Sequence, residues 1–380
     1  MISIRNLDVW YRSDAGEVHA VRGIDIEIKK GEFYTLLGPS GCGKTTTLRA
    51  LAGLERPEGG EIRIADQVVY AEKTNTNIPP YDRELGMVFQ SYAIWPHMNV
   101  FENVAFPLRE LPKKMPEKQV KELVLRALDL VQLHGLENRA APYLSGGQQQ
   151  RLALARAIVN GPRVLLLDEP LSNLDAKLRE ETRRELRALV KRLGITTVFV
   201  THDQLEALTM SDRVAVMKDG VIAQEGTPKE IYHAPVNRFV AEFIGTANFL
   251  EGTVAAVDVG EGLGTVTCGE GLLSSVLPEG VTPGERVSVV VRPEDIELRG
   301  KECASEPGMN VMPARVQDLV FIGESLDCTL NAWGQKLRFR AHPSSELCVD
   351  DMVNICLPPS RCRAVMGHSE VVVKEAAEKQ

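Results

Sequence analysis

The feature that most restricts the fold of this chain is a glycine-rich loop between an apolar run and a helix-like segment. The loop reads GPSGCGKT at residues 38–45 and fits the pattern G-x-x-x-x-G-K-[ST] without deviation. It follows the apolar run FYTLLG at 33–38 and leads into a segment with helical character that ends at Gly53. A strand, a glycine-rich turn and a helix in this order form a loop whose backbone N–H groups surround a phosphate. The sequence therefore predicts a phosphate-binding α/β domain.

Two residues of this loop carry its chemistry. Lys44 is placed to reach the β- and γ-phosphate oxygens of a nucleoside triphosphate, and the Thr45 hydroxyl is a candidate ligand for Mg²⁺. The pattern arises by chance in about one chain of this length in a hundred, and the flanking strand and helix argue against an accidental turn. The residues expected to bind the nucleotide here are Gly38, Pro39, Ser40, Gly41, Cys42, Gly43, Lys44, Thr45 and Thr46.

Two further apolar runs end in ionisable side chains. RVLLLDEP at 163–170 and ITTVFVTHD at 195–203 are continuously apolar, which fits parallel strands that are buried on both faces. At the end of the first, Asp168 is a candidate ligand for Mg²⁺ through water, and Glu169 is placed to polarise an attacking water. The alternative, a pair of solvated acids in a turn, does not explain the buried run that precedes them. His202 ends the second run; a lone histidine is usually a surface or core residue, but this one reaches the same sheet edge, where it can contact the γ-phosphate.

A second candidate phosphate site lies later in the chain. LSGGQQQRLALARAI at 144–158 predicts a helix whose first residues are Ser145, Gly146 and Gly147. Free N–H groups and the helix dipole make such a helix start suitable for an anion. The chain therefore carries two candidate phosphate sites.

A change in the residue pattern along the sequence divides the chain into domains. We predict an α/β domain over 1–236 with a helical subdomain at about 91–160, a connector at 237–246, and an all-β domain over 247–380. The prolines at 107, 112 and 116 predict breaks within the helical subdomain.

Composition excludes several classes of protein. The net charge of −8 gives no basic surface for a nucleic-acid partner, so we expect none. No run approaches the 18 apolar residues of a membrane span, and the first residues, MISIRNLDVW, do not resemble a signal peptide. The seven scattered cysteines indicate reduced thiols of a cytosolic protein. Six of them lie in the β domain without a C-x-x-C pair, which favours ordinary core thiols over a metal site.

Six motifs in order resemble those of the nucleotide-binding subunits of ATP-binding-cassette (ABC) transporters. They are GPSGCGKT, Gln90 in MVFQ, LSGGQ, LLLDEP, SNLD at 172–175 and VTHD at 200–203. The resemblance covers about residues 1–240 and implies a P-loop NTPase cassette with a mixed sheet and a helical subdomain. VRPEDIEL at 291–298 resembles the motif of the TOBE domain, an OB-like and regulatory β domain that follows the cassette in importers.

The resemblance also implies what binds and where. The cofactors are ATP and Mg²⁺, with Thr45, Gln90 and Asp168 at the metal. Two copies pair head to tail, so that Ser145, Gly146, Gly147 and Gln148 bind the partner's ATP. Asp175 lines the dimer interface, and His202 holds the γ-phosphate and orients Glu169. Gln90 senses the metal and the attacking water.

The residue that stacks on adenine is expected in the first strand. Tyr11 is our prediction, with Trp10 as the alternative, because both precede the residues GEV of the next strand.

The resemblance to importers of this family implies further partners. The segment 91–110, with Tyr92, Ile94, Trp95, Met98 and Phe101, corresponds to the groove for a membrane subunit. We therefore expect two transmembrane permease subunits, an extracytoplasmic solute-binding protein that acts indirectly, and a peripheral location at the cytoplasmic face of the inner (plasma) membrane. FIGTANFLEG at 243–252 favours a polyamine, ferric-iron or phosphonate importer. The alternatives are a sugar importer ATPase and a soluble ABC ATPase without a transport role.

Overall fold

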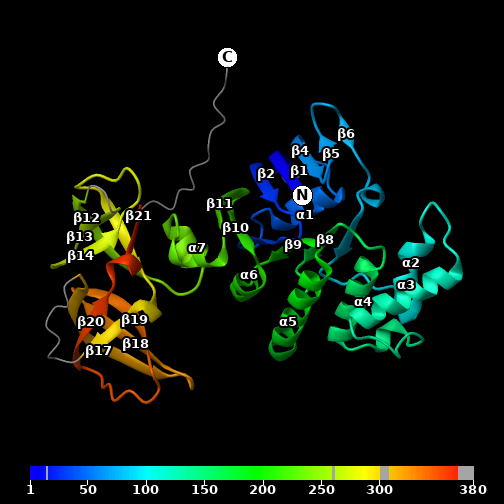
Figure 1. Cartoon of the computed structure of the whole chain (residues 1–380). Coiled ribbons are helices and arrows are strands. Elements are labelled where there is room, and N and C mark those ends of the chain that lie inside the picture. The colour runs from blue at the N-terminus through cyan, green and yellow to red at the C-terminus, as the bar shows by residue number, and fades with distance from the viewer. Residues whose placement is uncertain (14–15, 259–261, 300–307, 367–380) are drawn as a thin grey trace. The chain divides into compact units, whose positions relative to one another are not determined.

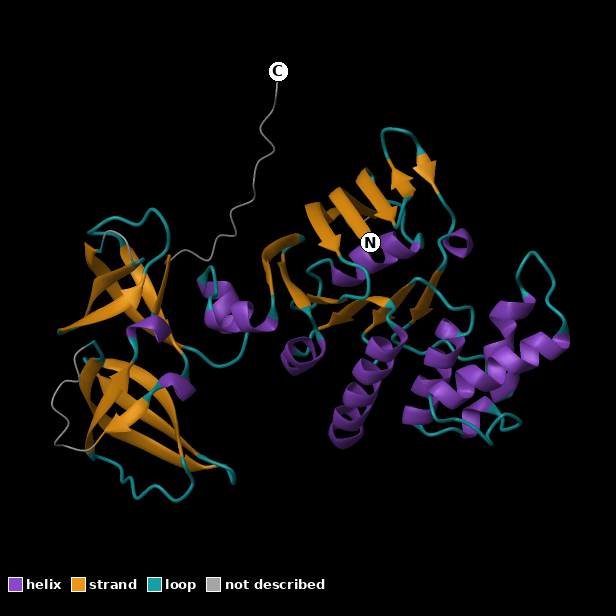
Figure 2. Cartoon of the chain, in the orientation of Figure 1, coloured by secondary structure: helices purple, strands orange, loops and turns teal. Residues whose placement is uncertain are grey.

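The chain folds into two compact units, which divide between Pro228 and Lys229, in the computed structural model shown in Figures 1 and 2. The structure describes residues 1–13, 16–258, 262–299 and 308–366. The sequence-based division at residue 236 with a connector at 237–246 stays a prediction. The division falls after the first residue of the helix α7 (Pro228–His233), and the helix α8 (Arg238–Phe243) follows it.

A six-stranded sheet forms the centre of the first unit, in the order β11-β10-β3-β9-β8-β7. All neighbours are parallel except β10 and β11, which are antiparallel and form a hairpin. Every residue of β3, β8 and β9 is buried, as the continuous apolar runs predicted for β8 and β9. The strands are β3 (Phe33–Leu37), β7 (Leu85–Val88), β8 (Val164–Asp168), β9 (Thr196–Thr201), β10 (Arg213–Lys218) and β11 (Val221–Gly226).

A five-stranded antiparallel sheet covers one side of this centre. Its order is β2-β1-β4-β5-β6, and the helix α1 (Lys44–Ala52) shares a core with it. Leu48 and Leu51 of α1 lie in the same buried cluster as Ile4 of β1 and Leu36 of β3, so α1 is fixed from two sides. The strands are β1 (Ile2–Ser13), β2 (Gly16–Ile28), β4 (Gly59–Ile64), β5 (Gln67–Ala71) and β6 (Thr76–Asn77).

Three helices form the subdomain that the sequence places at about 91–160. They are α2 (Val100–Arg109), α3 (Glu117–Leu130) and α4 (Gly146–Ile158). Their apolar faces form one cluster with Leu165 and Leu167 of β8 and with the long helix α5 (Ala176–Leu193), and Figure 2 shows this group of helices beside the sheet. The expected break at Pro107 is wrong, because Pro107 lies inside α2. Pro107 removes one N–H donor from the helix, which nevertheless continues to Arg109.

Short helices complete the described chain. The helix α6 (Gln204–Met210) follows β9. The 3-10 helices are η1 (Pro80–Asp82), η2 (Ala141–Tyr143), η3 (Pro293–Asp295) and η4 (Pro359–Arg361). Within the described residues, no helix has the length and apolar character needed to cross a membrane.

The second unit is built almost entirely from strands, in agreement with the predicted β-rich domain. Five strands close a barrel in the order β12-β13-β14-β21-β15, and five form a sheet in the order β16-β20-β17-β18-β19. One apolar cluster, with Val289 and Leu330 among its members, joins barrel and sheet. The barrel strands are β12 (Asn248–Val257), β13 (Leu263–Cys268), β14 (Gly271–Val276), β15 (Arg286–Val291) and β21 (Arg363–Met366). The sheet strands are β16 (Glu297–Arg299), β17 (Asn310–Phe321), β18 (Leu326–Ala332), β19 (Gln335–Ala341) and β20 (Met352–Leu357).

The cysteines of this unit behave as core residues. Cys268, Cys328, Cys356 and Cys362 are buried, whereas Cys348 is exposed, and Cys303 lies outside the described residues. Among the residues that the structure describes, no group of three or more His, Cys, Asp or Glu is arranged to hold a metal ion.

Candidate nucleotide site

The parallel order of β3, β9 and β8 brings three chain segments to one edge of the sheet. The loop 38–43 leaves β3, Glu169 follows β8, and His202 follows β9. The loop turns into α1 at Gly43, whose φ of 100° lies in the left-handed region. A Cβ there would lie 2.4 Å from the carbonyl oxygen of Ala20, so only glycine fits this position. Gly41 also has a positive φ, but its missing side chain would meet open space.

Lys44 occupies the middle of the glycine-rich loop. Its ammonium donates hydrogen bonds to the carbonyls of Gly38 and Pro39, each at 2.8 Å, and lies 3.7 Å from Cys42 Sγ. Lys44 is only 5% exposed, and among the described residues no carboxylate lies within ion-pair distance of it, although its charge acts on Asp168. A buried cation without an anionic partner is costly, and a phosphate supplies that partner. The loop therefore fits a nucleotide phosphate.

Thr45 and Asp168 form the candidate metal site. The Thr45 hydroxyl donates to Asp168 Oδ1 at 3.0 Å, and Asp168 is 4% exposed. Burial raises the pKa of this carboxyl, and the hydrogen bond from Thr45 acts in the opposite direction. A hydroxyl and a carboxylate are the hard oxygen donors that Mg²⁺ prefers, so the donor set fits this ion.

Glu169 lies between two candidate catalytic side chains. Its Oε2 accepts a hydrogen bond from Gln90 Nε2 at 3.3 Å and lies 3.2 Å from His202 Nδ1. The Glu169 backbone has a φ of 42°, an unusual value for a non-glycine residue. This conformation is held by the bonds Glu169 N–H to Val200 O at 3.0 Å and Ser172 Oγ to Glu169 O at 2.9 Å. A carboxylate fixed between an amide and an imidazole at the phosphate edge has the placement of a general base.

Sequence reasoning missed residues that support this group. Asn173 Nδ2 donates to the Gln90 carbonyl at 2.8 Å, which connects the SNLD segment to Gln90. Arg179 lies 3.8 Å from Asp203 and donates to Leu174 O at 2.9 Å. The position of Asn173 inside SNLD was the available signal. Arg179 lies in a segment whose pattern predicts an exposed helix, so no sequence signal indicated its contacts.

The residues of the second candidate phosphate site form the start of α4. Ser145 caps the helix: the Gln148 N–H donates to its Oγ at 3.4 Å, and the Ser145 N–H donates to Gln148 Oε1 at 3.0 Å. A Cβ on Gly147 would lie 3.1 Å from Leu178 of α5, whereas Gly146 has more space. Asp175 caps α5 by accepting from the Leu178 N–H at 3.0 Å.

Within one chain the two candidate phosphate sites do not meet. Thr45 bonds Asp168, and Glu169 contacts both Gln90 and His202. In the described structure no hydrogen bond joins Ser145 or Gln148 to the loop 38–46. Figure 1 shows α4 beside α2 and α3, in a different part of the unit from α1.

Tyr11 and Trp10 point to different surroundings. The Tyr11 hydroxyl lies 3.3 Å from Thr46 Oγ1, next to the loop, and donates to Glu55 at 3.2 Å. Burial is the largest cause that raises the pKa of Tyr11. Trp10 instead stacks on His19 with ring centroids 3.9 Å apart. Tyr11 thus lies beside the loop, and its stacking on the base stays a prediction.

Fold and site together define a P-loop ATPase of the ABC class. The family model described as ABC transporter matches residues 21–172, and the one described as TOBE domain matches residues 289–365. A solved dimeric structure of the ATP-binding cassette MJ0796 bound to ADP and Pi is 32% identical, with a TM-score of 0.53; the match covers 60% of this chain and 99% of that one. The solved structure of cbiO1 from Clostridium perfringens, part of the ABC transporter complex cbiONQ, has a TM-score of 0.53 and 32% identity, and covers 60% of this chain and 89% of that one.

Curated relatives match over most of their length. The spermidine/putrescine import ATP-binding protein PotA of Rubrobacter xylanophilus is 50% identical over 83% of this chain and 81% of that protein. The trehalose/maltose import ATP-binding protein MalK of Thermococcus litoralis is 47% identical over 85% of this chain and 86% of that protein. The chain belongs to the ATP-binding subunits of ABC importers, and it is an ATPase that drives import.

Proposed function

We propose that this chain works as a homodimer in which each ATP lies between the glycine-rich loop of one copy and the α4 helix start of the other. The observation that carries this proposal is the separation of Lys44 from Ser145 within one chain. Both places suit a phosphate, yet no contact in the described chain joins them. A head-to-tail pair brings the two halves together, and the MJ0796 cassette was solved as a dimer.

Within this composite site, the residues divide the chemistry as follows. Lys44 and the loop amides hold the β- and γ-phosphates, and Thr45, Gln90 and Asp168 hold Mg²⁺. Bound Mg²⁺ would neutralise negative charge on the phosphates. Glu169 takes a proton from the attacking water, and His202 and Gln90 keep the Glu169 carboxylate in position. Tyr11 stacks on the adenine.

The partner copy completes the site. Ser145, Gly146, Gly147 and Gln148 direct the start of α4 toward the γ-phosphate held by the other copy. Asp175, which already caps α5, lies at the dimer interface.

The membrane contact is proposed for residues 91–106. Ile94, Trp95 and Met98 are half-buried, and Trp95 packs on Phe106 with ring centroids 4.2 Å apart. Tyr92 does not belong to this surface as the sequence suggested, because it is 5% exposed and part of the helical core. Two permease subunits dock here, which places the chain at the cytoplasmic face of the inner membrane, with the solute-binding protein acting from the other side.

We further propose that the imported solute is a polyamine. Several relatives with 48–50% identity are named as spermidine/putrescine import proteins. The trehalose/maltose protein, at 47% identity, keeps a sugar as the second candidate. Ferric iron and phosphonate, which the segment 243–252 also allows, have no comparable support.

Uptake by cells tests the proposal. Cells that carry this chain with the permease genes next to its own gene are given labelled spermidine, putrescine or maltose. The proposal expects saturable uptake of the polyamines that disappears in the Lys44→Ala variant. Uptake of maltose alone would replace the polyamine by a sugar. If cells with the wild-type chain contain the folded, membrane-bound complex and take up none of the three solutes, that result would contradict the proposed import of a polyamine or a sugar.

A further inference from the structure

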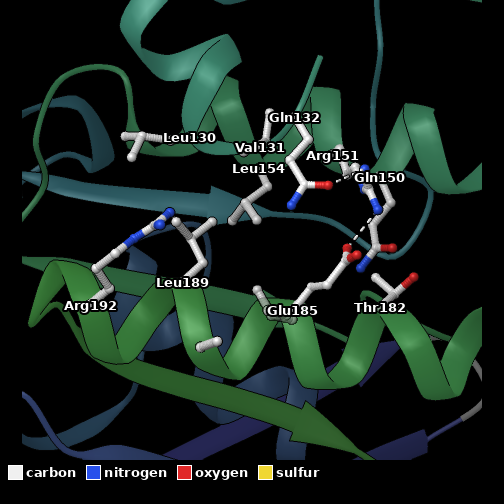
Figure 3. Close-up of a pocket in the computed structure, with 12 residues that line it drawn as sticks. Leu130, Val131, Gln132, Gln150, Arg151, Leu154, Thr182, Glu185, Leu189 and Arg192 are labelled. Atoms are coloured by element: carbon white, nitrogen blue, oxygen red, sulfur yellow. Dashed lines mark hydrogen bonds and ion pairs between the residues drawn. The ribbon is translucent and has the colours of Figure 1, made fainter. Parts of the chain in front are cut away.

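A pocket of about 250 Å³ lies in the first unit, away from the nucleotide residues (Figure 3). It opens between the end of α3, the helix α4 and the middle of α5. Its volume is below the roughly 300 Å³ at which sites for drug-sized ligands begin, so it suits a small molecule. Its walls are largely apolar side chains: Leu130, Val131, Leu154, Leu186 and Leu189.

The charged side chains around the pocket leave one positive charge uncompensated. Arg151 is paired with Glu185 at 2.6 Å and also donates to Gln132. The exposed Arg192 lines the other end of the pocket, as Figure 3 shows, and no ion pair is found for it among the described residues. An apolar cavity with one free guanidinium at its edge favours a ligand with a single negative charge and disfavours cations.

On the α4 side of the pocket, a buried side-chain amide lacks a hydrogen-bond partner. Gln150 is 3% exposed, and its Oε1 is buried without a hydrogen-bond partner in the described structure. Figure 3 shows this side chain extending from α4 toward α5 near Thr182. A buried amide without a partner is unfavourable, and a ligand hydroxyl in the pocket can form the missing bond.

We propose that this pocket binds a small aromatic carboxylic acid that carries one hydroxyl. The ring packs against Leu154, Leu186 and Leu189, the carboxylate pairs with Arg192, and the hydroxyl bonds the amide of Gln150. No bond of the ligand is made or broken, so the site is one of binding alone.

Such a ligand would connect two helices that begin at the proposed composite site. The helix α4 starts after Ser145, and α5 starts after Asp175. A molecule wedged between them fixes their relative position, so it alters the rate of ATP hydrolysis. This consequence rests on the proposed function, whereas the binding itself does not.

Titration of the full-length protein with 3-(4-hydroxyphenyl)propanoate, followed by ligand-observed NMR, tests the binding. We expect saturable binding to one site, weaker binding of 3-phenylpropanoate and of the methyl ester, and no competition by spermidine. Arg192→Gln should weaken binding of the acid by about two- to fivefold, as expected for a partly exposed ion pair. Arg184→Gln removes the same charge from the same helix outside the pocket and should change nothing.

Two further variants test whether the acid binds in this pocket or elsewhere on the protein surface. Gln150→Leu should abolish the preference for the hydroxylated acid over 3-phenylpropanoate. Leu189→Trp should fill the pocket and abolish binding, and its thermal unfolding shows whether it remains folded. If Leu189→Trp does not fold, Arg192→Gln and Gln150→Leu decide the question. Absence of saturable binding at millimolar acid, or binding that all three variants leave unchanged, would overturn the proposal. Neither result depends on ATP hydrolysis, so the proposed function is tested separately.

Discussion

At the scale of single residues, buried ionisable side chains are found in the candidate nucleotide site. Lys44 has no carboxylate partner among the described residues, and Asp168 is buried beside the Thr45 hydroxyl. Glu169 keeps an unfavourable φ of 42° between Gln90 and His202. Each of these features costs stability in the protein alone, and each fits a ligand that carries phosphate and a hard cation.

A buried acid next to this site gives a prediction on pH. Burial raises the pKa of Glu206, which is 3% exposed and accepts a 2.5 Å bond from Thr201 Oγ1. Because its pKa is higher in the folded than in the unfolded chain, folding loses stability as the pH rises from below the unfolded value through the folded one. In Glu206→Gln the amide oxygen accepts the same bond without a charge. We expect a melting temperature about 2–4 °C higher at pH 8, the shift that about 1 kcal/mol produces.

The gain should disappear as the pH falls toward 4, where wild-type Glu206 is protonated and resembles glutamine. Differential scanning calorimetry at several pH values measures this difference. A gain that is equal at pH 4 and pH 8, or a lower melting temperature of the variant at pH 8, would contradict the assignment.

The candidate ligand-binding and catalytic residues were easier to predict from the sequence than the residues that hold them in place. Lys44, Asp168 and His202 belong to short motifs whose local strand and turn decide their position, so a single sequence indicates them. Asn173 and Arg179 act through contacts with segments far apart in the chain, and only the fold brings those segments together.

At the scale of elements, α4 connects the second candidate phosphate site to the segment after Gln90. Its Arg156 donates to the carbonyls of Ala93 at 2.6 Å and Tyr92 at 2.7 Å. Both of these residues have a positive φ. The Arg156 guanidinium also lies 4.6 Å from the ring centre of Trp95. Arg156 therefore holds a strained turn next to the proposed permease contact.

Replacing Arg156 by alanine should destabilise the protein. Two carbonyls of a strained turn lose a charged donor, which costs about 2–3 kcal/mol. Urea unfolding measures this loss, and the exposed Arg163, which pairs with Glu84, provides a control as Arg163→Ala. Equal stability of the two variants would show that Arg156 does not hold the turn. We expect Arg156→Lys to lie between wild type and alanine, because lysine cannot bond both carbonyls and cover Trp95 with the same geometry.

Elements were predicted well where a pattern is local and long. The apolar runs at 33–38, 163–170 and 195–203 became β3, β8 and β9, and the predicted helical subdomain contains α2, α3 and α4. The wrong predictions concern residues whose environment depends on how the chain packs in the fold. Pro107 is tolerated near the end of α2, and Tyr92 is buried under the helical core rather than exposed for docking.

At the scale of the whole molecule, each of the two compact units has its own internal anchors. In the second unit, Arg292 of the VRPEDIEL segment is 3% exposed, and it donates to Tyr232 O and Thr246 O, both at 3.0 Å, and to Ala241 O at 3.2 Å. These carbonyls belong to α7, α8 and the segment before β12. The motif that indicated the β domain thus fixes the helices to the barrel.

Arg292→Ala should release these helices from the barrel. Three carbonyls lose their donor, so we expect faster cleavage by trypsin between residues 229 and 247 and a lower melting temperature of the second unit. Mass spectrometry of the early fragments locates the cuts. Arg286→Ala, an exposed arginine at the start of β15, serves as the control. A cleavage pattern in Arg292→Ala identical to that of the control would contradict the anchoring role.

The central claim for the whole molecule is that Glu169 activates water at a site built by two copies. Sedimentation velocity of Glu169→Gln with Mg-ATP, together with its hydrolysis rate, tests this claim most directly. The account predicts hydrolysis lowered by about 10²–10⁴-fold, as for the loss of a general base, and a stable dimer that holds ATP. A variant that hydrolyses ATP at nearly the wild-type rate, or that binds ATP and remains monomeric, would contradict it.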